Sequence, residues 1–140
     1  METKIPQFGA GRPKTPEPET FGSAFGHAVW LMTMSNDHQE RSIGSLKSGA
    51  LNAFLLKQFK LYFKGKQPVA FVAWAMMSDK VQEKFNNGEL LELADWRSGH
   101  NLVVVDCVAP FSKIEDVEAE FLGEMKKVVS RTGKQGKSDA

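Results

Sequence analysis

The sequence predicts a single domain of the mixed α/β (α+β) class, in which helices flank a central mixed sheet. Several segments carry apolar residues every three or four positions, which is typical of helices that bury one face. Residues 59–63 instead alternate apolar and polar side chains, and residues 69–75 and 102–108 are almost continuously apolar, as in strands. The resulting order is helix, helix, hairpin, helix, strand, helix, which favours helices packed on a sheet.

The chain has 140 residues, enough for one hydrophobic core. Residues 7–20 are rich in Gly, Pro, Thr and Glu, and residues 130–140 contain no large apolar side chain. Such segments cannot bury enough apolar surface to offset the entropy of ordering. We therefore expect a flexible leader over residues 1–20, one folded domain over residues 21–129 and a flexible tail over residues 130–140.

Charge and cysteine content exclude several classes of protein. Lys and Arg number 18 against 17 Asp and Glu, and a net charge of +1 predicts no nucleic-acid or anionic-membrane partner. The chain shows no signal-peptide pattern and no apolar run long enough to span a bilayer. The single cysteine, Cys107, excludes an internal disulfide and a multi-cysteine zinc site, and is typical of a reducing compartment. We expect a cytoplasmic protein without a bound metal or an integral membrane segment.

Apolar spacing predicts the first two helices. Residues 25–34 form an apolar segment compatible with a helix, which breaks at residues 35–37, of types that favour caps and turns. A second apolar stripe recurs at three- and four-residue steps through residues 46–55. His38 therefore lies at the junction between two helices.

A hairpin and a short helix are expected next. Residues 59–63 and 69–75 form the two strands, and residues 64–67 form the turn between them. The second strand should be buried on both faces because it is continuously apolar. A capping-box pattern and an Asn-Gly end predict a helix over residues 79–87, and residues 90–93 could add a short strand.

The last strand and helix are marked by a proline and a second capping box. Residues 102–108 are apolar except for Asp106, and Pro110 ends the strand because it cannot continue a central ladder. Ser112 and Glu115 have capping-box spacing and open the final helix. Its apolar face is formed by Val117, Phe121, Met125 and Val128.

A carboxylate among valines and a histidine at a loop are the candidate catalytic groups. Asp106 incurs a large desolvation cost, so it accepts backbone hydrogen bonds, pairs with Arg97 as a fixed core ion, or belongs to a functional site. His38 is suited to proton transfer near neutral pH, and loops often display catalytic groups. His27 lies in an apolar helical stretch and is expected in the core, whereas His100 lies in a polar loop and is expected in solvent.

Other chemistries have less support in the sequence. Cys107 should face away from Asp106, because adjacent strand residues point to opposite faces, and its apolar surroundings favour a core position. Lysines around the hairpin form a solvated edge or receive an acidic partner. They are Lys57, Lys60, Lys64 and Lys66. No glycine-rich phosphate loop, zinc spacing or nucleophile elbow is present, which leaves acid–base chemistry by a histidine and a buried aspartate.

Five blocks of the sequence match one known family in order and spacing. They are Gly26-His27-Ala28-Val29-Trp30-Leu31, Ser35-Asn36-Asp37-His38, Pro68-Val69-Ala70-Phe71 with Trp74-Ala75, Asp95-Trp96-Arg97-Ser98-Gly99, and Asp106-Cys107-Val108-Ala109-Pro110-Phe111. Over residues 25–129 the chain thereby resembles the RTX toxin-activating lysine acyltransferases, the hemolysin-activating type. The last two blocks are the most specific and resemble the family's Trp-containing loop and the strand with its catalytic aspartate.

The resemblance implies a fold similar to the GNAT acetyltransferases, here in a short form. It also implies an enzyme that transfers a fatty acyl group from acyl carrier protein to a lysine of an RTX protoxin, with no bound cofactor. By the same resemblance, His38 is the catalytic base and Asp106 orients it. Ser35 is then an auxiliary hydrogen-bonding group, and Trp96 and Arg97 belong to the substrate-binding loop. The lysines at the hairpin would receive acyl carrier protein.

Two functions of other kinds stay open. A GNAT-like N-acyltransferase that uses acyl-coenzyme A would need a glycine-rich turn for the pyrophosphate after the Asp106 strand, and no clear one follows. A non-catalytic adaptor that binds a secreted protein would have no chemical need for both His38 and Asp106. Neither the acyl length nor the oligomeric state follows from the sequence, and a homodimer is one alternative.

Overall fold

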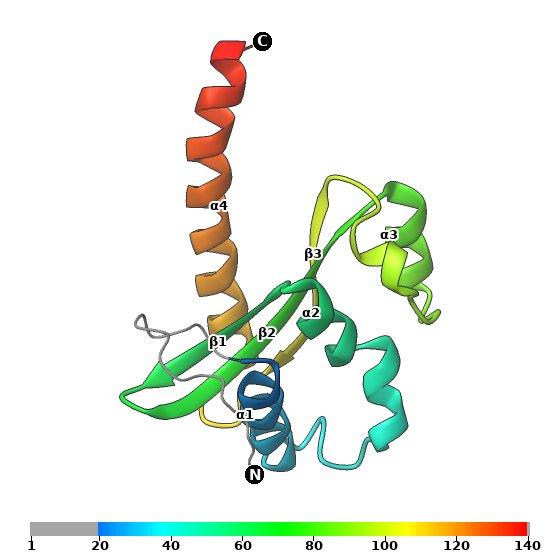
Figure 1. The fold of residues 1–140 in the computed structure, drawn as a ribbon, viewed down its shortest axis with the longest axis vertical. Coiled ribbons are helices and arrows are strands. Elements are labelled where there is room, and N and C mark those ends of the chain that lie inside the picture. Colours follow the sequence, from blue (N-terminus) through cyan, green and yellow to red (C-terminus); the bar gives the residue numbers. More distant parts are fainter. Residues whose placement is uncertain (1–19, 140) are drawn as a thin grey trace, which may run out of the picture.

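The computed structural model describes residues 20–139, with side chains for residues 20–128 (Figure 1). Its elements in chain order are α1 (Phe21–Thr33), η2 (Ile43–Ser48), α2 (Ala50–Leu56), β1 (Phe59–Lys64), β2 (Gln67–Met77), α3 (Asp79–Asn86), η3 (Leu93–Trp96), β3 (Asn101–Val108) and α4 (Ile114–Asp139). This order confirms the α+β class. The predicted leader lies outside the described residues except for Thr20, whose side chain accepts a hydrogen bond from the backbone N–H of Ser23 and caps α1.

The sheet has the strand order β1-β2-β3, and both strand pairs are antiparallel. The predicted hairpin is confirmed, with Gly65 at a positive φ of 64° in its turn, a conformation that glycine adopts without steric cost. β2 is central and largely buried, which explains its continuous apolar run. The expectation of a mixed sheet is wrong for the described residues, where every ladder between strands is antiparallel.

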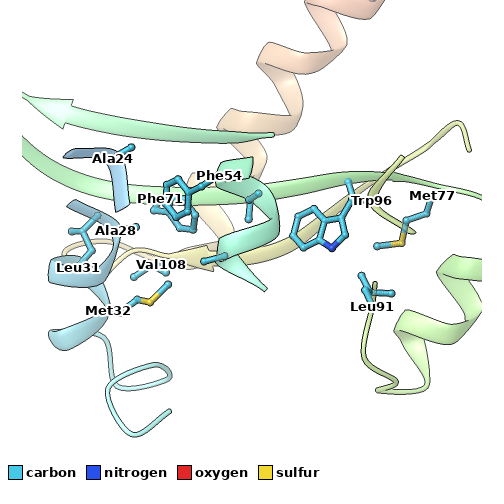
Figure 2. Packing of buried hydrophobic residues seen from close by; sticks show 14 residues of the cluster. Ala24, Ala28, Leu31, Met32, Phe54, Phe71, Met77, Leu91, Trp96 and Val108 are labelled. Carbon is cyan, nitrogen blue, oxygen red and sulfur yellow. The ribbon is translucent and has the colours of Figure 1, made fainter. Parts of the chain in front are cut away.

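Helices cover both faces of this sheet. Buried residues of α1 and α2 pack with Phe71 and Val108 on one face, in a cluster that extends to Trp96 and Met77 (Figure 2). A smaller cluster on the other face joins Cys107 of β3 to Phe121 of α4. Each face of the sheet is thus excluded from water by a different part of the chain.

The predicted second helix is interrupted. Residues 43–48 form the 3-10 helix η2, and α2 begins only at Ala50. Gly49 between them has φ −125° and ψ −108°, which are not helical values. Apolar periodicity alone does not reveal the break, because the stripe continues across it.

The short strand expected at residues 90–93 is not formed. Leu90 is 76% exposed, and η3 begins at Leu93. The Asp95 carboxylate accepts hydrogen bonds from the backbone N–H of Glu92 and from Nζ of Lys84 on α3, at 2.9 and 3.0 Å. These bonds favour a capped turn over an extended segment. α3 itself forms as predicted, although the capping-box pattern begins at Asp79 and the N-cap in the structure is Ser78.

α4 is the longest helix and runs to Asp139, through backbone that was expected to be a flexible tail. Phe121 anchors its first half on the sheet, and the Tyr62 hydroxyl donates a hydrogen bond of 2.9 Å to Glu124. Figure 1 shows the C-terminal part of the helix projecting beyond the sheet. Within the described part of the chain, no helix combines the length and apolar character needed to cross a membrane.

Candidate active site

The segment after α1, residues 35–41, places three polar side chains on one side of the backbone. The backbone N–H of His38 donates to the carbonyl of Ser35, and that of Arg41 donates to the carbonyl of His38, each at 3.0 Å. Consecutive turns of three residues place side chains i and i+3 one above the other. Ser35, His38 and Arg41 therefore share one side of this segment.

A β-bulge in β3 turns Asp106 toward the same side. Ala73 of β2 pairs with Asp106, but the next residue, Trp74, pairs with Val104, so Val105 is the extra residue. Val105 packs with the cluster under α1 and α2, and regular alternation would send Asp106 to the opposite face, toward α4. The bulge resets the alternation and directs the carboxylate to the α1 side.

His38 and Asp106 meet there in direct contact. The ring nitrogen Nε2 of His38 lies 2.8 Å from Oδ1 of Asp106, and Nδ1 lies 2.6 Å from the hydroxyl of Ser35. Nη1 of Arg41 donates to Oδ2 of Asp106 at 2.9 Å. The side chain of His38 is 2% exposed and that of Asp106 is 15% exposed, whereas that of Arg41 is 47% exposed. The four groups form a chain of hydrogen bonds from the interior to the surface.

The charges of these four groups determine which atoms carry the protons. Burial alone would raise the pKa of Asp106, but the hydrogen bonds and attraction from His38 and Arg41 outweigh burial and hold that pKa below its ordinary value. The ionised carboxylate can only accept, so Nε2 of His38 is the donor in their contact. In the neutral ring Nδ1 then carries the lone pair and accepts from the Ser35 hydroxyl. The basic nitrogen of the imidazole is therefore the one that faces Ser35.

A pocket of about 310 Å³ opens over three of these groups, His38, Arg41 and Asp106. Its walls come from the segment after α1, from β3 and from the start of α4, where Ile114 and Glu118 lie. β3 is an edge strand in the described part of the sheet, so the pocket lies along an edge that no other described strand covers. A carbonyl substrate could reach His38 and Asp106 from solvent by this route.

Trp96 and Arg97, the residues expected to bind substrate, lie elsewhere. Trp96 is fully buried in the main core cluster, and Nε of Arg97 donates to Oε1 of the buried Gln58 at 2.6 Å. Nε2 of Gln58 donates to the carbonyls of Trp74 and Trp96, each at 3.1 Å. Neither Trp96 nor Arg97 lines the pocket that holds His38. The hydrogen bonds of Trp96 and Arg97 with Gln58 join η3 to the sheet. Contact of Trp96 and Arg97 with a substrate stays a prediction.

The alternative partner for Asp106 is also excluded. Arg97 hydrogen-bonds Gln58 and the carbonyl of Leu56, whereas the guanidinium on Asp106 belongs to Arg41. Sequence reasoning did not single out Arg41. The signal that points to Arg41 is the three-residue spacing of Ser35, His38 and Arg41. This spacing becomes informative only when the segment is known to form turns of three residues.

Of the remaining candidate groups, His100 and Cys107 take the positions expected of them, whereas the expectation that His27 lies in the core is wrong, because its side chain on α1 stays partly open to solvent. His27 packs edge-on against Phe63 and is half-buried, and His100 is exposed. Cys107 faces the α4 side, away from the carboxylate of Asp106. Burial, with smaller contributions from Glu118 and Asp106, raises the pKa of its thiol to about 12. The thiol is therefore protonated at neutral pH and is a poor nucleophile.

Comparison with known proteins identifies relatives of this chain. The family model described as the RTX toxin acyltransferase family matches residues 17–138. The chain is 30% identical over 90 residues to a protein-lysine myristoyltransferase, RtxC, of Kingella kingae, across 64% of this chain and 54% of that protein. It is 32% identical over 90 residues to an RTX-III toxin-activating lysine-acyltransferase, ApxIIC, of Actinobacillus pleuropneumoniae, across 64% and 52%.

A third relative is a protein-lysine myristoyltransferase, HlyC, of Escherichia coli, 31% identical over 87 residues, which are 61% of this chain and 50% of that protein. The chain thus spans about half the length of the curated relatives that it matches. The family match itself covers α1, the sheet, the site and most of α4. This chain belongs to the RTX toxin acyltransferase family.

Proposed function

We propose that the site around His38 and Asp106 transfers a fatty acyl group from a thioester to the ε-amine of a lysine in an RTX protoxin. One observation carries the proposal: Nε2 of His38 lies 2.8 Å from Oδ1 of Asp106 beneath a pocket open to solvent. An imidazole paired with a buried carboxylate is a suitable general base for amine attack on a carbonyl. The relatives named protein-lysine myristoyltransferases and toxin-activating lysine-acyltransferases support the same reaction.

The donor in this proposal is acyl carrier protein, and the compartment is the cytoplasm. A single, buried cysteine is consistent with a reducing compartment. The basic residues expected to receive the donor include Lys60, which lies on β1, at the opposite edge of the sheet from β3. Lys60 is within 3.6 Å of Glu124, so part of its charge is already neutralised. Docking of the donor at this edge is part of the proposal.

The proposed reaction starts with a neutral lysine amine. Its lone pair attacks the thioester carbonyl, a C–N bond forms, and the C–S bond breaks as the carrier thiolate leaves. The proton lost by the amine reaches Nδ1 of His38 and is then given to the thiolate, so that the products are an amide and a thiol. Asp106 stabilises the imidazolium between the two proton transfers.

Ser35 lies on the path of that proton. Both nitrogens of His38 are already hydrogen-bonded, Nε2 to Asp106 and Nδ1 to the Ser35 hydroxyl, and Ser35 itself is only 6% exposed. An amine that reaches this hydroxyl can donate to its oxygen while the hydroxyl proton moves to Nδ1. Ser35 thereby connects the buried base to the substrate.

The experiment mixes this protein with an RTX protoxin that carries its acceptor lysine. Two labelled donors are compared, myristoyl-acyl carrier protein and myristoyl-coenzyme A. We expect an amide-linked acyl group on the lysine from the carrier-protein thioester. Transfer from the coenzyme A thioester alone would instead identify a GNAT-like N-acyltransferase. Protoxin binding with no transfer from either donor would identify an adaptor and overturn the proposal.

A further inference from the structure

Both oxygens of the Asp106 carboxylate are occupied by hydrogen-bond donors from different parts of the chain. Oδ1 accepts from Nε2 of His38 at 2.8 Å and from the backbone N–H of Cys107 at 3.0 Å. Oδ2 accepts from Nη1 of Arg41 at 2.9 Å. The reaction proposed for the site uses His38 and Asp106, and leaves the contact with Arg41 unexplained.

The contact with Arg41 limits how the carboxylate can turn. The terminal torsion of an aspartate side chain is broad and roughly two-fold, so a carboxylate held at one oxygen can swing or exchange its oxygens. A guanidinium on Oδ2 opposes both motions. A guanidinium group is also a permanent cation in proteins, so its contact favours the ionised form of the carboxylate.

The orientation of Asp106 determines which nitrogen of His38 is basic. A fixed, ionised acceptor at Oδ1 keeps the proton of the neutral ring on Nε2 and leaves the lone pair of Nδ1 facing Ser35. If the carboxylate turned away or became protonated, the ring could adopt the other tautomer. The lone pair would then point at Asp106 and no longer at Ser35.

We propose that Arg41 is a positioning residue, which holds Oδ2 of Asp106 and thereby keeps His38 in the tautomer whose basic nitrogen faces Ser35. Its effect on acyl transfer rests on the proposed function, whereas its effect on the tautomer does not. Arg41 acts through Asp106: its guanidinium donates to that carboxylate, and its one hydrogen bond to His38 joins the two backbones and does not reach the imidazole ring.

A purely stabilising ion pair is the competing explanation for Arg41. Its side chain is 47% exposed, and ion pairs at that exposure contribute little to stability. The other titratable groups at the pocket are Asp37 on the same segment, Glu118 on α4 and the protonated thiol of Cys107. The structure shows no hydrogen bond between Asp106 and either Asp37 or Glu118, and Arg41 is the cation that contacts its carboxylate from the solvent side.

The test compares the parent chain with Arg41→Met, Arg41→Lys and Lys47→Met, the last a control that removes an exposed cation from the neighbouring segment η2. Long-range ¹⁵N–¹H spectra of the His38 ring report its tautomer without any substrate. We expect the neutral ring of the parent to carry its proton on Nε2, and Arg41→Met to give a mixture. Arg41→Lys should restore most of the parent spectrum, because it restores the charge, and Lys47→Met should leave the spectrum unchanged.

Kinetics give the second measurement. Arg41→Met should lower kcat about ten- to a hundredfold with KM for the protoxin unchanged, and should move the acid limb of the rate profile to higher pH. An unchanged tautomer in Arg41→Met, or a change in KM alone, overturns the proposal. If the parent transfers no acyl group, the proposed function fails, and the spectra alone still support or overturn the positioning of His38 by Arg41.

Discussion

His38 and Asp106, which are 68 residues apart in the chain, lie in contact with 2.8 Å between Nε2 and Oδ1. The contact depends on two local features, the turn that follows α1 and the bulge at Val105 in β3. Without either feature the two groups would be on different sides of the sheet or out of reach. The predictions below concern this contact and the groups around it.

Replacing the carboxylate by its isosteric amide should disable the site and preserve the fold. Asp106→Asn removes the charge that holds the His38 tautomer, and we expect the rate of acyl transfer to fall about a hundred- to ten-thousandfold. Asp37→Asn is the matched control, because Asp37 lines the same pocket without a hydrogen bond to His38. Equal rates for Asp106→Asn and the parent, measured on samples with parent-like circular dichroism, would exclude Asp106 from the chemistry.

Asp106 should also contribute to the pH dependence of stability. Its pKa in the folded state is below the ordinary value, because His38 and Arg41 outweigh the effect of burial. Such a group stabilises the fold above its unfolded-state pKa, and this contribution is lost as the pH falls through the folded-state value. Urea titrations between about pH 7 and pH 3 should therefore show a steeper loss of unfolding free energy in the parent than in Asp106→Asn. Parallel curves for the two proteins would contradict the arrangement of charges described here.

Cys107 should be dispensable for the reaction. Its thiol has a pKa raised to about 12 and faces α4, so we expect Cys107→Ala to retain the parent rate. Loss of the buried sulfur should lower the unfolding free energy by about 1 kcal/mol. Iodoacetamide should label the native chain at neutral pH far more slowly than a free cysteine. Rapid labelling that abolishes transfer would instead show that the thiol takes part.

The position of Trp96 separates a role in the core from a role in substrate binding. Its side chain is fully buried, and Nε1 has no hydrogen-bond partner within the described residues. Trp96→Phe should therefore lower the unfolding free energy by about 1–3 kcal/mol through the smaller ring, with KM for the protoxin unchanged. A raised KM at parent-like stability would support the substrate-binding role predicted from the family resemblance.

Gln58 should be among the most sensitive polar residues outside the pocket. Its buried amide joins Trp74, Trp96 and Arg97. Gln58→Leu leaves two carbonyls and a guanidinium without this partner, and should cost about 2–4 kcal/mol of unfolding free energy. Gln39→Leu, at an exposed position, is the control and should change stability by less than about 0.5 kcal/mol. Thermal or urea denaturation of the two variants measures the difference.

The helices and strands that were predicted correctly are those determined by residues close together in the sequence. The hairpin, α1, α3, β3 and the start of α4 follow from apolar periodicity and turn residues, and all form within a few residues of the expected bounds. The predicted capping boxes are less exact, since Ser78 caps α3 and α4 begins at Ile114, two residues after Ser112. The break at Gly49 and the turn at η3 were not predicted. The break depends on the backbone conformation of Gly49, and the turn depends on the hydrogen bond between Lys84 and Asp95; periodicity contains neither.

The candidate site shows the same division. His38, Asp106 and Ser35 could be named from residue type and family resemblance, but the direction of the carboxylate could not. A bulge has no reliable sequence signature here, because Val105 resembles its valine neighbours, and only the register with β2 reveals it. Arg41 was missed for a related reason: its partner is distant in sequence, and its spacing becomes informative only when the turns after α1 are known.

The central claim is that His38 is the base of an acyl-transfer site. The most direct measurement is the mass-spectrometric rate of lysine acylation from myristoyl-acyl carrier protein by His38→Ala, beside His100→Ala as the exposed histidine control. The account predicts loss of transfer in His38→Ala, by at least about a hundredfold, and a parent-like rate in His100→Ala. A folded His38→Ala that acylates the lysine at the parent rate would contradict it.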